Sequence, residues 1–232
     1  MKLNPRLHQI NQMITRQYAH IWDCCCDHGL LGAALLDKQA ASHVHFVDTV
    51  PHVMANLEDK LKRFYSQLAP KNQATISTQW HTHCLNAKSL PLEPSSQAQL
   101  IIIAGVGGEL TLEIIENLLQ LHSKIPLEFL ICPVHHQFKV RQRLKQLQLG
   151  LIDESLIQDN HRFYEIIHVS TQATDPITSV GNKMWDLSLK THQDYLIKTI
   201  AHYENIAKGN QQAHSQPIQA YQALLAQLKS YA

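Results

Sequence analysis

Near its N-terminus the chain reads Ile21-Trp22-Asp23-Cys24-Cys25-Cys26-Asp27-His28-Gly29, and the apolar stretch Leu30–Leu36 follows directly. The first residues favour a buried strand, the glycine favours a tight turn, and the apolar stretch favours a helix. A strand that leads through a glycine turn into a helix is where open α/β sheets bind nucleotide-like ligands. We therefore expect a ligand site at this turn.

The composition of this turn indicates which ligand it suits. A dinucleotide site uses three glycines, so that backbone amides can approach a diphosphate. Between positions 21 and 36 the only glycines are Gly29 and Gly32, and Asp23 and Asp27 add negative charge. Such a turn suits a cationic ligand without a phosphate, such as S-adenosylmethionine (SAM), better than it suits NAD. An NAD-dependent oxidoreductase is the weaker alternative.

Length and composition limit the class of protein. The 232 residues are enough for one α/β domain with an appendage. No apolar run approaches the roughly 20 residues that cross a bilayer, and no secretory signal is recognisable, so we expect no membrane association. Five cysteines, three of them adjacent, make a poor disulfide framework and favour a reduced, cytoplasmic protein.

Charge gives a weaker constraint on partners. The net charge is +1 with 16 histidines counted as neutral, whereas nucleic-acid binders usually carry a basic surplus. Any basic patch must therefore be local, although histidines gain charge near pH 6.5. One candidate is the segment His135–Lys145, which includes Lys139, Arg141 and Arg143. It either follows phosphates or forms an ordinary solvated helix face, and we favour the solvated face.

Strands and helices alternate along the first 170 residues. Apolar and β-branched runs predict strands at His20–Asp23, Val44–Asp48, Thr75–Trp80, Leu100–Ala104, Leu127–Cys132, Leu151–Ile157 and Phe163–Ser170. Helical periodicity predicts helices at Leu3–Ile14, Leu30–Leu36, Pro51–Leu68, from Gly108 through Leu119, and Gln137–Leu149. This alternation predicts an α/β fold, a Rossmann-like, doubly wound parallel sheet with an antiparallel strand at one edge.

The pattern changes from about residue 175 onward. Leu189, Leu196 and Tyr203 are spaced seven apart, which indicates a heptad-like helix. Gly209 and Asn210 interrupt it, and Pro217 is expected to begin the last helix. We therefore expect a ligand-binding domain over residues 1–174 and a C-terminal helical hairpin over residues 175–232. The hairpin is either a packing appendage or a substrate-binding arm.

Two acidic residues at strand ends are candidates for ligand contacts. Asp48 lies 19 residues after Gly29, where nucleotide-binding folds place an acid that binds the ribose hydroxyls. Asp23 closes the first strand and would face the methionyl end of SAM. For both residues the alternative is local, because an acid at these positions can instead cap the following helix.

Two further segments each allow a functional and a structural interpretation. Cys24, Cys25 and Cys26 with His28 invite a zinc site, but adjacent strand residues point to opposite faces and no second ligand segment has the usual spacing. We expect small buried thiols and no metal there. The Gly105–Gly108 segment either lets a planar base approach the backbone or simply turns into the next helix.

Five segments together resemble one family. They are D-x-x-x-D-H-G at Asp23–Gly29, V-D-x-x-P at Val47–Pro51, I-I-A-G-V-G-G at Ile102–Gly108, C-P-V at Cys132–Val134 and R-F-Y-E-I-I at Arg162–Ile167. In this order they resemble the bacterial tRNA adenine-N1 methyltransferases that modify position twenty-two. These are class I SAM-dependent enzymes with a helical C-terminal extension. The resemblance covers most of residues 1–170 and implies SAM as cofactor and tRNA as partner.

The resemblance assigns roles residue by residue. It implies cofactor contacts at Asp23, Cys25, Gly29, Asp48, His83, Cys84, Ala104 and Gly105. It implies substrate contacts at Val106, Gly107, Pro133 and Tyr164. Asp27 and His28 are the candidates beside the reacting base, where either could orient the adenine N6 or take its proton.

Three positions depart from the family pattern. Cys25 stands where the family has glycine, His83 where it has the acid that meets the adenine of the cofactor, and Val134 where it has asparagine. These departures indicate a divergent branch. A SAM methyltransferase that acts on another RNA, a protein or a metabolite is therefore the main alternative. The other is a non-catalytic nucleotide-binding module that mediates assembly, and the oligomeric state is left open.

Overall fold

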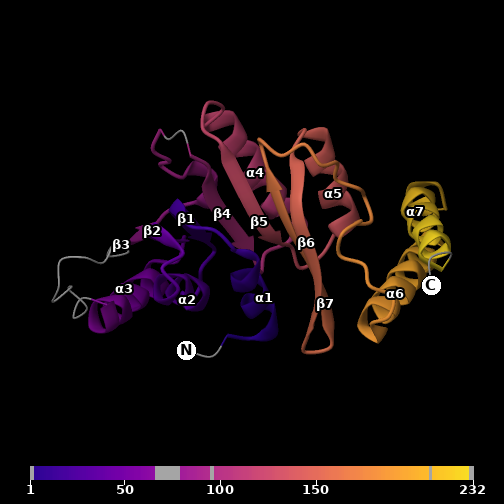
Figure 1. The fold of residues 1–232 in the computed structure, drawn as a ribbon, viewed down its shortest axis with the longest axis horizontal. Coiled ribbons are helices and arrows are strands. Elements are labelled where there is room, and N and C mark those ends of the chain that lie inside the picture. Colours follow the sequence, from indigo (N-terminus) through magenta and orange to yellow (C-terminus); the bar gives the residue numbers. More distant parts are fainter. Residues whose placement is uncertain (1–2, 66–78, 95–96, 209–210, 230–232) are drawn as a thin grey trace.

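Seven strands form one sheet in the order β3-β2-β1-β4-β5-β7-β6 in the computed structural model, which describes residues 3–65, 79–94, 97–208 and 211–229 (Figure 1). The strands are β1 Tyr18–Cys24, β2 Ala41–Asp48, β3 Gln79–Cys84, β4 Gln99–Ala104, β5 Leu127–Cys132, β6 Gly150–Asp159 and β7 Arg162–Ser170. The helices are α1 Pro5–Met13, α2 Leu30–Asp37, α3 Pro51–Tyr65, α4 Gly108–Leu121, α5 Gln137–Gln146, α6 Lys190–Ala207 and α7 Gln211–Lys229, with a short 3-10 turn η1 at Ala87–Ser89. The predicted α/β sheet is confirmed.

The order of the strands creates one special place in the sheet. β1 to β5 run parallel, and β7 is antiparallel to β5 and to β6. The chain leaves β1 toward β2 and β3 on one side and returns to β4 on the other. The carboxyl ends of β1 and β4 therefore lie side by side, with Cys24 paired to Ile103. Open α/β sheets bind ligands at such a point of reversal.

Apolar side chains cover both faces of the central strands β4 and β5, which is why these strands read as continuous apolar runs. On one face, α1, α2 and α3 pack through residues such as Ile10, Leu35 and Leu57. On the other face, α4 and α5 pack through residues such as Ile115 and Leu144. None of the described helices is long and apolar enough to cross a bilayer.

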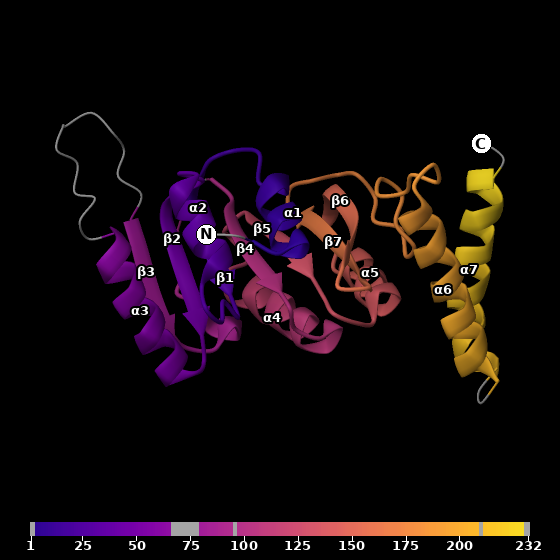
Figure 2. The same cartoon turned by 90° about the horizontal axis from the view of Figure 1, so that it is seen from below.

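The C-terminal helices α6 and α7 pair with each other at the end of the molecule opposite β3 and α3 (Figures 1 and 2). Their shared core contains Leu196, Tyr221 and Leu224, and Phe138 of α5 belongs to the same cluster. The expected helical pair is therefore present and packs against the sheet domain through α5. The division at residue 174 stays a prediction.

A buried ion cluster also joins the helical pair to the sheet domain. Arg141 of α5 is fully buried and donates to Glu154 and Glu165, each at 2.6 Å. Tyr195 of α6 donates to the other oxygen of Glu165 at 2.6 Å. The prediction of a solvated basic face was therefore wrong for Arg141, because tertiary packing turns this one cation inward.

Several predicted boundaries were also wrong. The third strand was predicted at Thr75–Trp80, but β3 continues to Cys84; the predicted start at residues 75–78 lies outside the described ranges. Pro217 lies inside α7 instead of beginning it. The helix predicted to reach Leu149 ends at Gln146. Two residues later, Gln148 adopts a left-handed φ of 58°, which does not belong to a right-handed helix. Local patterns locate an element better than its ends.

Candidate functional site

The turn after β1 has an unusual backbone. Cys25, Asp27 and Gly29 all have positive φ, of 58°, 47° and 69°. Gly29 is required here, because a Cβ at this position would lie 2.5 Å from a methyl carbon of Leu57 on α3. Non-glycine residues with positive φ are costly and cluster at functional sites. The sequence therefore builds a tight, strained turn exactly between β1 and α2.

A cavity of ≈ 210 Å³ opens beside this turn. It lies between α1, the turn after β1 and the loop after β4. Seven of the predicted site residues line it: Asp23, Cys25, Asp27, His28, Ala104, Gly105 and Val106. The structure thus brings together residues that are about 80 positions apart in the sequence, as the strand order requires.

Asp23 forms a buried acidic wall of this cavity. Its side chain is 4% exposed, and Oδ2 accepts the backbone N–H of Gly32 at 2.9 Å. Burial raises the pKa of Asp23 to about 7, and the Gly32 hydrogen bond opposes that rise only in part. The carboxyl binds an amide of α2 and also lines the cavity, and its contact with the methionyl end of SAM stays a prediction.

Arg6 is a cavity residue that the sequence analysis missed. It lies on α1, lines the cavity, and places its guanidinium 5.0 Å from the ring centroid of Tyr164. Its Nε is buried without a hydrogen-bond partner. Because α1 precedes the sheet in sequence, no local motif could have indicated that it packs beside this turn. The guanidinium of an arginine that lines a cavity can bind an anionic group of a ligand.

Asp48 acts on the same turn from β2. Its Oδ1 accepts the amides of Thr49 at 2.7 Å and Val50 at 3.2 Å, and its Oδ2 accepts the amide of Asp27 at 3.2 Å. These bonds tie the end of β2 to the turn after β1. Asp48 does not line the cavity of ≈ 210 Å³, so its predicted contact with a ribose stays a prediction.

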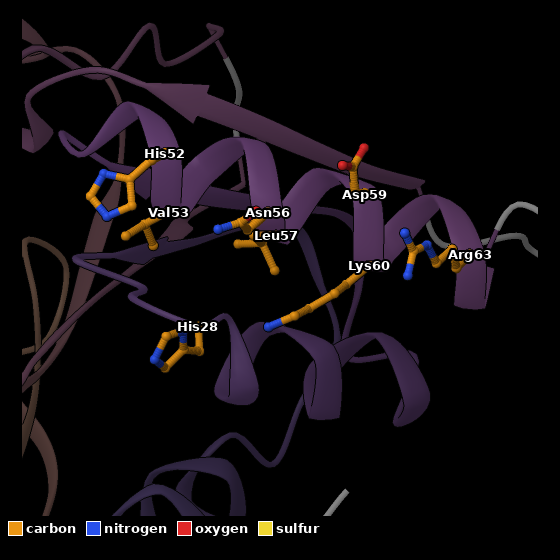
Figure 3. Close-up of a pocket in the computed structure, with 8 residues that line it drawn as sticks. All are labelled: His28, His52, Val53, Asn56, Leu57, Asp59, Lys60 and Arg63. Atoms are coloured by element: carbon orange, nitrogen blue, oxygen red, sulfur yellow. The ribbon is translucent and has the colours of Figure 1, made fainter.

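Asp27 and His28 lie at the open side of the turn. Their side chains are 72% and 66% exposed, with Asp27 Oδ1 at 3.7 Å from His28 Nε2. His28 also lines a second groove of ≈ 310 Å³ along α3, where Lys60 and Arg63 project from the helix (Figure 3). The pair is therefore accessible to a large substrate as well as to a small ligand.

The loops after β4 and β5 are held against each other. Val134 donates its N–H to the carbonyl of Val106 at 2.9 Å. A Cβ at Gly107 would lie 2.6 Å from Cε1 of His135, so the ring of His135 packs directly against this glycine. This packing brings the predicted substrate residues Val106, Gly107 and Pro133 to one region, next to the cavity.

A larger pocket of ≈ 670 Å³ lies between the loop after β5, the hairpin of β6 and β7, and the C-terminal helices. Among the residues that line it, the basic ones are His135, His136, Arg162, Lys198 and His202, and the aromatic ones are Phe163, Tyr164, Tyr195, Tyr203 and Tyr221. Cationic and aromatic side chains in one groove are the combination that binds single-stranded nucleic acid.

The remaining predicted residues lie at the end of β3. His83 is paired with Val47 and Cys84 with Asp48, beside the β2 end but not in the lining of the smaller cavity. His83 also belongs to a row of imidazoles described below. Cys24 and Cys26 are buried, as expected for small thiols in a tight turn, whereas Cys25 is half-buried and lines the cavity.

The sheet and the cavity together define a Rossmann-like methyltransferase fold, with an antiparallel strand β7 between β5 and β6. A family model described as a methyltransferase domain matches residues 3–167. The chain belongs to this methyltransferase domain family, which confirms that part of the sequence-based expectation.

Solved structures are similar along nearly the whole chain. A Streptococcus pneumoniae protein in complex with S-adenosyl-L-methionine has a TM-score of 0.76 and 18% identity, over 97% of this chain and 100% of that one. The M. capricolum TrmK, solved with S-adenosyl-homocysteine, has a TM-score of 0.68 and 17% identity, over 100% and 98%. The B. subtilis m1A22 tRNA methyltransferase TrmK has a TM-score of 0.64 and 19% identity, over 98% and 96%. A comparison with curated protein sequences finds no match.

Proposed function

We propose that this chain is a SAM-dependent methyltransferase that methylates N1 of an adenine in tRNA. One observation carries the proposal: the structural similarity to the B. subtilis and M. capricolum enzymes extends through the C-terminal helices, beyond the methyltransferase domain itself. The chain therefore shares with them the sheet and also the helical pair that borders the larger pocket. A tRNA substrate would place the protein in the cytoplasm.

The residues around the smaller cavity fit the proposed cofactor. SAM carries a carboxylate, an ammonium and a sulfonium, and the cavity is lined by Arg6 and by the buried carboxyl of Asp23. We assign Arg6 to the carboxylate and Asp23 to the positive charge of the methionyl end. Asp48 would bind the ribose, with His83 and Cys84 toward the adenine. Cys25, Gly29, Ala104 and Gly105 would line the remaining surface.

When bound, SAM supplies an electrophilic methyl group. The N1 of adenine has a free lone pair, so no base has to remove a proton before attack, and the protein acts mainly by orientation. N1 is also the Watson–Crick acceptor, which requires an unpaired or flipped adenine. Asp27 and His28, exposed at the mouth, would orient N6 or accept its proton.

The larger pocket is the proposed place of the RNA. Its aromatic side chains, together with Arg162, Lys198 and His202, would contact phosphates and unstacked bases. Tyr164, which lies under Arg6, connects this pocket to the cofactor cavity. Val106, Gly107 and Pro133 lie between the two and would contact the target base. The local basic groups explain how a chain of net charge +1 can hold an anionic polymer.

A methylation assay tests the proposal directly. Purified protein is incubated with radiolabelled SAM and tRNA transcripts that carry adenine at position twenty-two, or guanine there as the control. We expect 1-methyladenosine in digested nucleosides from the first transcript only. Binding of SAM by calorimetry without methylation of any tRNA would favour the alternative of another substrate. Failure to bind either SAM or its demethylated product would reject the enzyme altogether.

A further inference from the structure

Outside the proposed cofactor cavity, Glu109, His135 and His136 form a compact cluster of metal-ligating side chains. Their ligand atoms all lie within 4.8 Å of one another. Within the described ranges, no other three His, Cys, Asp or Glu side chains bring their ligand atoms so close together. His136 Nδ1 lies 2.5 Å from Glu109 Oε1, and His135 Nδ1 lies 3.8 Å from Glu109 Oε2. We propose that these three residues bind a divalent transition-metal ion of the Zn²⁺, Ni²⁺ or Co²⁺ class.

The backbone that brings these side chains together is strained at His136. Glu109 lies in the first turn of α4, directly after the glycine loop, whereas the two histidines form the turn between β5 and α5. His136 adopts a left-handed φ of 66°, and the ring of His135 packs on Gly107. A strained non-glycine residue that is held beside a ligand set is a feature of functional sites.

The chemistry of the donors suits such an ion. Two imidazoles and one carboxylate, with further positions open to water, are typical ligands of divalent transition metals. Ligand atoms on one zinc lie within roughly 4 Å of each other, so small rotations of these exposed side chains complete the set.

Lys139 gives the proposal a specific signature. Its Nζ lies 3.6 Å from Glu109 Oε1, so its ammonium forms an ion pair with the carboxylate and would compete with a metal ion for it. An ion would displace this ammonium, which is on a flexible and mostly exposed side chain. The bound ion would clamp the β5–α5 turn to the start of α4, and so hold the Gly107 loop. This site requires neither SAM nor RNA, and its test is independent of the proposed methyl transfer.

The test uses the full-length, tag-free protein after treatment with a chelator, and titrates it with ZnCl₂ by calorimetry at pH 7.5. We expect saturation at one ion per chain and a rise in the melting temperature. The double change Glu109→Gln and His136→Asn should weaken binding by about tenfold or more. Asparagine is chosen because it tolerates the left-handed backbone. Lys139→Met should strengthen binding, because it removes the competing cation.

Matched variants on the sheet separate this site from other histidines. The change His43→Gln with His81→Gln removes two imidazoles that lie 3.1 Å apart on β2 and β3. It should leave the affinity for Zn²⁺ at the proposed site unchanged. The proposal is overturned if wild-type protein shows no saturable binding, if binding survives the Glu109 and His136 changes, or if it depends on His43 and His81 instead. Circular dichroism checks that each variant is folded.

Discussion

Asp23 lines the proposed cofactor cavity, and the burial of its carboxyl changes its acid–base behaviour. Its pKa of about 7 lies above the value of roughly 3.9 expected in the unfolded chain. Between pH 4 and 7 the unfolded chain ionises Asp23, whereas the ligand-free folded protein keeps it largely protonated, so the free energy of unfolding falls as the pH rises over this range. A cation bound nearby would reverse the preference and favour the carboxylate.

We predict that SAM binding releases protons through Asp23. At pH 7 the carboxyl is about half protonated, so binding of a cationic ligand should release up to about half a proton per chain. Calorimetry in phosphate and in Tris, which differ in ionisation enthalpy, measures this release. Asp23→Asn keeps the acceptor for the Gly32 amide and should abolish the difference between buffers. Equal binding enthalpies in both buffers for the wild type would contradict the assignment.

Asp27 is expected to act on the methyl transfer and not on cofactor affinity. Its side chain is 72% exposed and its hydrogen bond to Asp48 uses only the backbone N–H. Asp27→Ala should therefore bind SAM like the wild type but lose roughly 10²-fold or more in the rate of methyl transfer. Asp27→Asn is the matched variant, because asparagine tolerates the positive φ.

The two measurements on Asp27 are calorimetric affinity for SAM and single-turnover transfer of label to tRNA. A parallel loss of both in Asp27→Asn would show that the side chain belongs to the cofactor site instead. A loss of affinity in Asp27→Ala alone would point to backbone strain. The first result would remove Asp27 from the reacting base, whereas the second would leave Asp27→Asn as the variant that decides its role.

At the level of the elements, the strands β1, β2 and β3 present a row of imidazoles on one face of the sheet: His20, His43, His45, His81 and His83. Ring nitrogens of His45 lie 3.0 Å from those of His20 and of His83. His45 also stacks on Trp22 with ring centroids 3.8 Å apart. The described residues between β3 and β4 form only the short turn η1, so that connection contributes no long helix to cover this row.

This histidine row should make the protein sensitive to acid. Burial, and after it the neighbouring imidazoles, lowers the pKa of His45 to about 2. Burial also lowers the pKa of His20, His81 and His83. At His20 and His81 the charge of Glu93 opposes this lowering of the pKa. Their folded-state pKa values thus lie below the unfolded value of 6.5. The unfolded chain binds more protons below that pH, so the free energy of unfolding falls as the pH drops.

We expect the free energy of unfolding to fall by about 1 kcal/mol between pH 7.5 and 5.5 through His45 alone, because only the unfolded chain protonates this imidazole over that range. Urea denaturation at the two pH values measures the loss. His45→Phe keeps a ring on Trp22 and removes the titration, so its stability should change less with pH than that of the wild type. His8→Gln, at an exposed position on α1, is the control and should behave like the wild type. An unchanged pH dependence in His45→Phe would refute this role.

For the whole molecule, the buried cluster around Arg141 joins the sheet domain to the C-terminal helices. Arg141 binds Glu154 and Glu165, Glu154 also accepts amides from the connection at Asn182 and Lys183, and Tyr195 of α6 donates to Glu165. The pKa of Glu154 is lowered, because Arg141 and these amides outweigh the effect of burial. The larger pocket lies beside this junction, so its shape depends on the cluster.

Arg141→Met should destabilise the protein by about 3–5 kcal/mol, because two buried carboxylates lose their counter-charge. Arg143→Met is the matched control on the same helix. Arg143 pairs with Glu116 at the surface, and its loss should cost less than about 1 kcal/mol. Urea denaturation at pH 7.5 compares the two variants. Similar small losses in both would show that the buried cluster contributes little.

The order of the elements and the ligand turn could be predicted from the sequence, because periodicity, glycines and strand ends are local signals. The pairing of Asp23 with the loop at Ala104 and Gly105 also followed, since the strand order of this fold brings those ends together. The beginning of α7 and the end of β3 did not follow. Pro217 lies inside α7, at a position where local preference disfavours proline, and β3 continues past the predicted end at Trp80.

Other features depended on contacts between residues far apart in the chain. Arg6 enters the cavity because α1 packs beside β6 and α2, and no pattern within α1 encodes that position. Arg141 looks like its basic neighbours in sequence, but the antiparallel β6–β7 pair places two carboxylates against it. The imidazole row and the Glu109 cluster likewise arise from strand register and loop packing. Local sequence thus determined the class of fold, whereas long-range packing decided which charges are buried and which face a ligand.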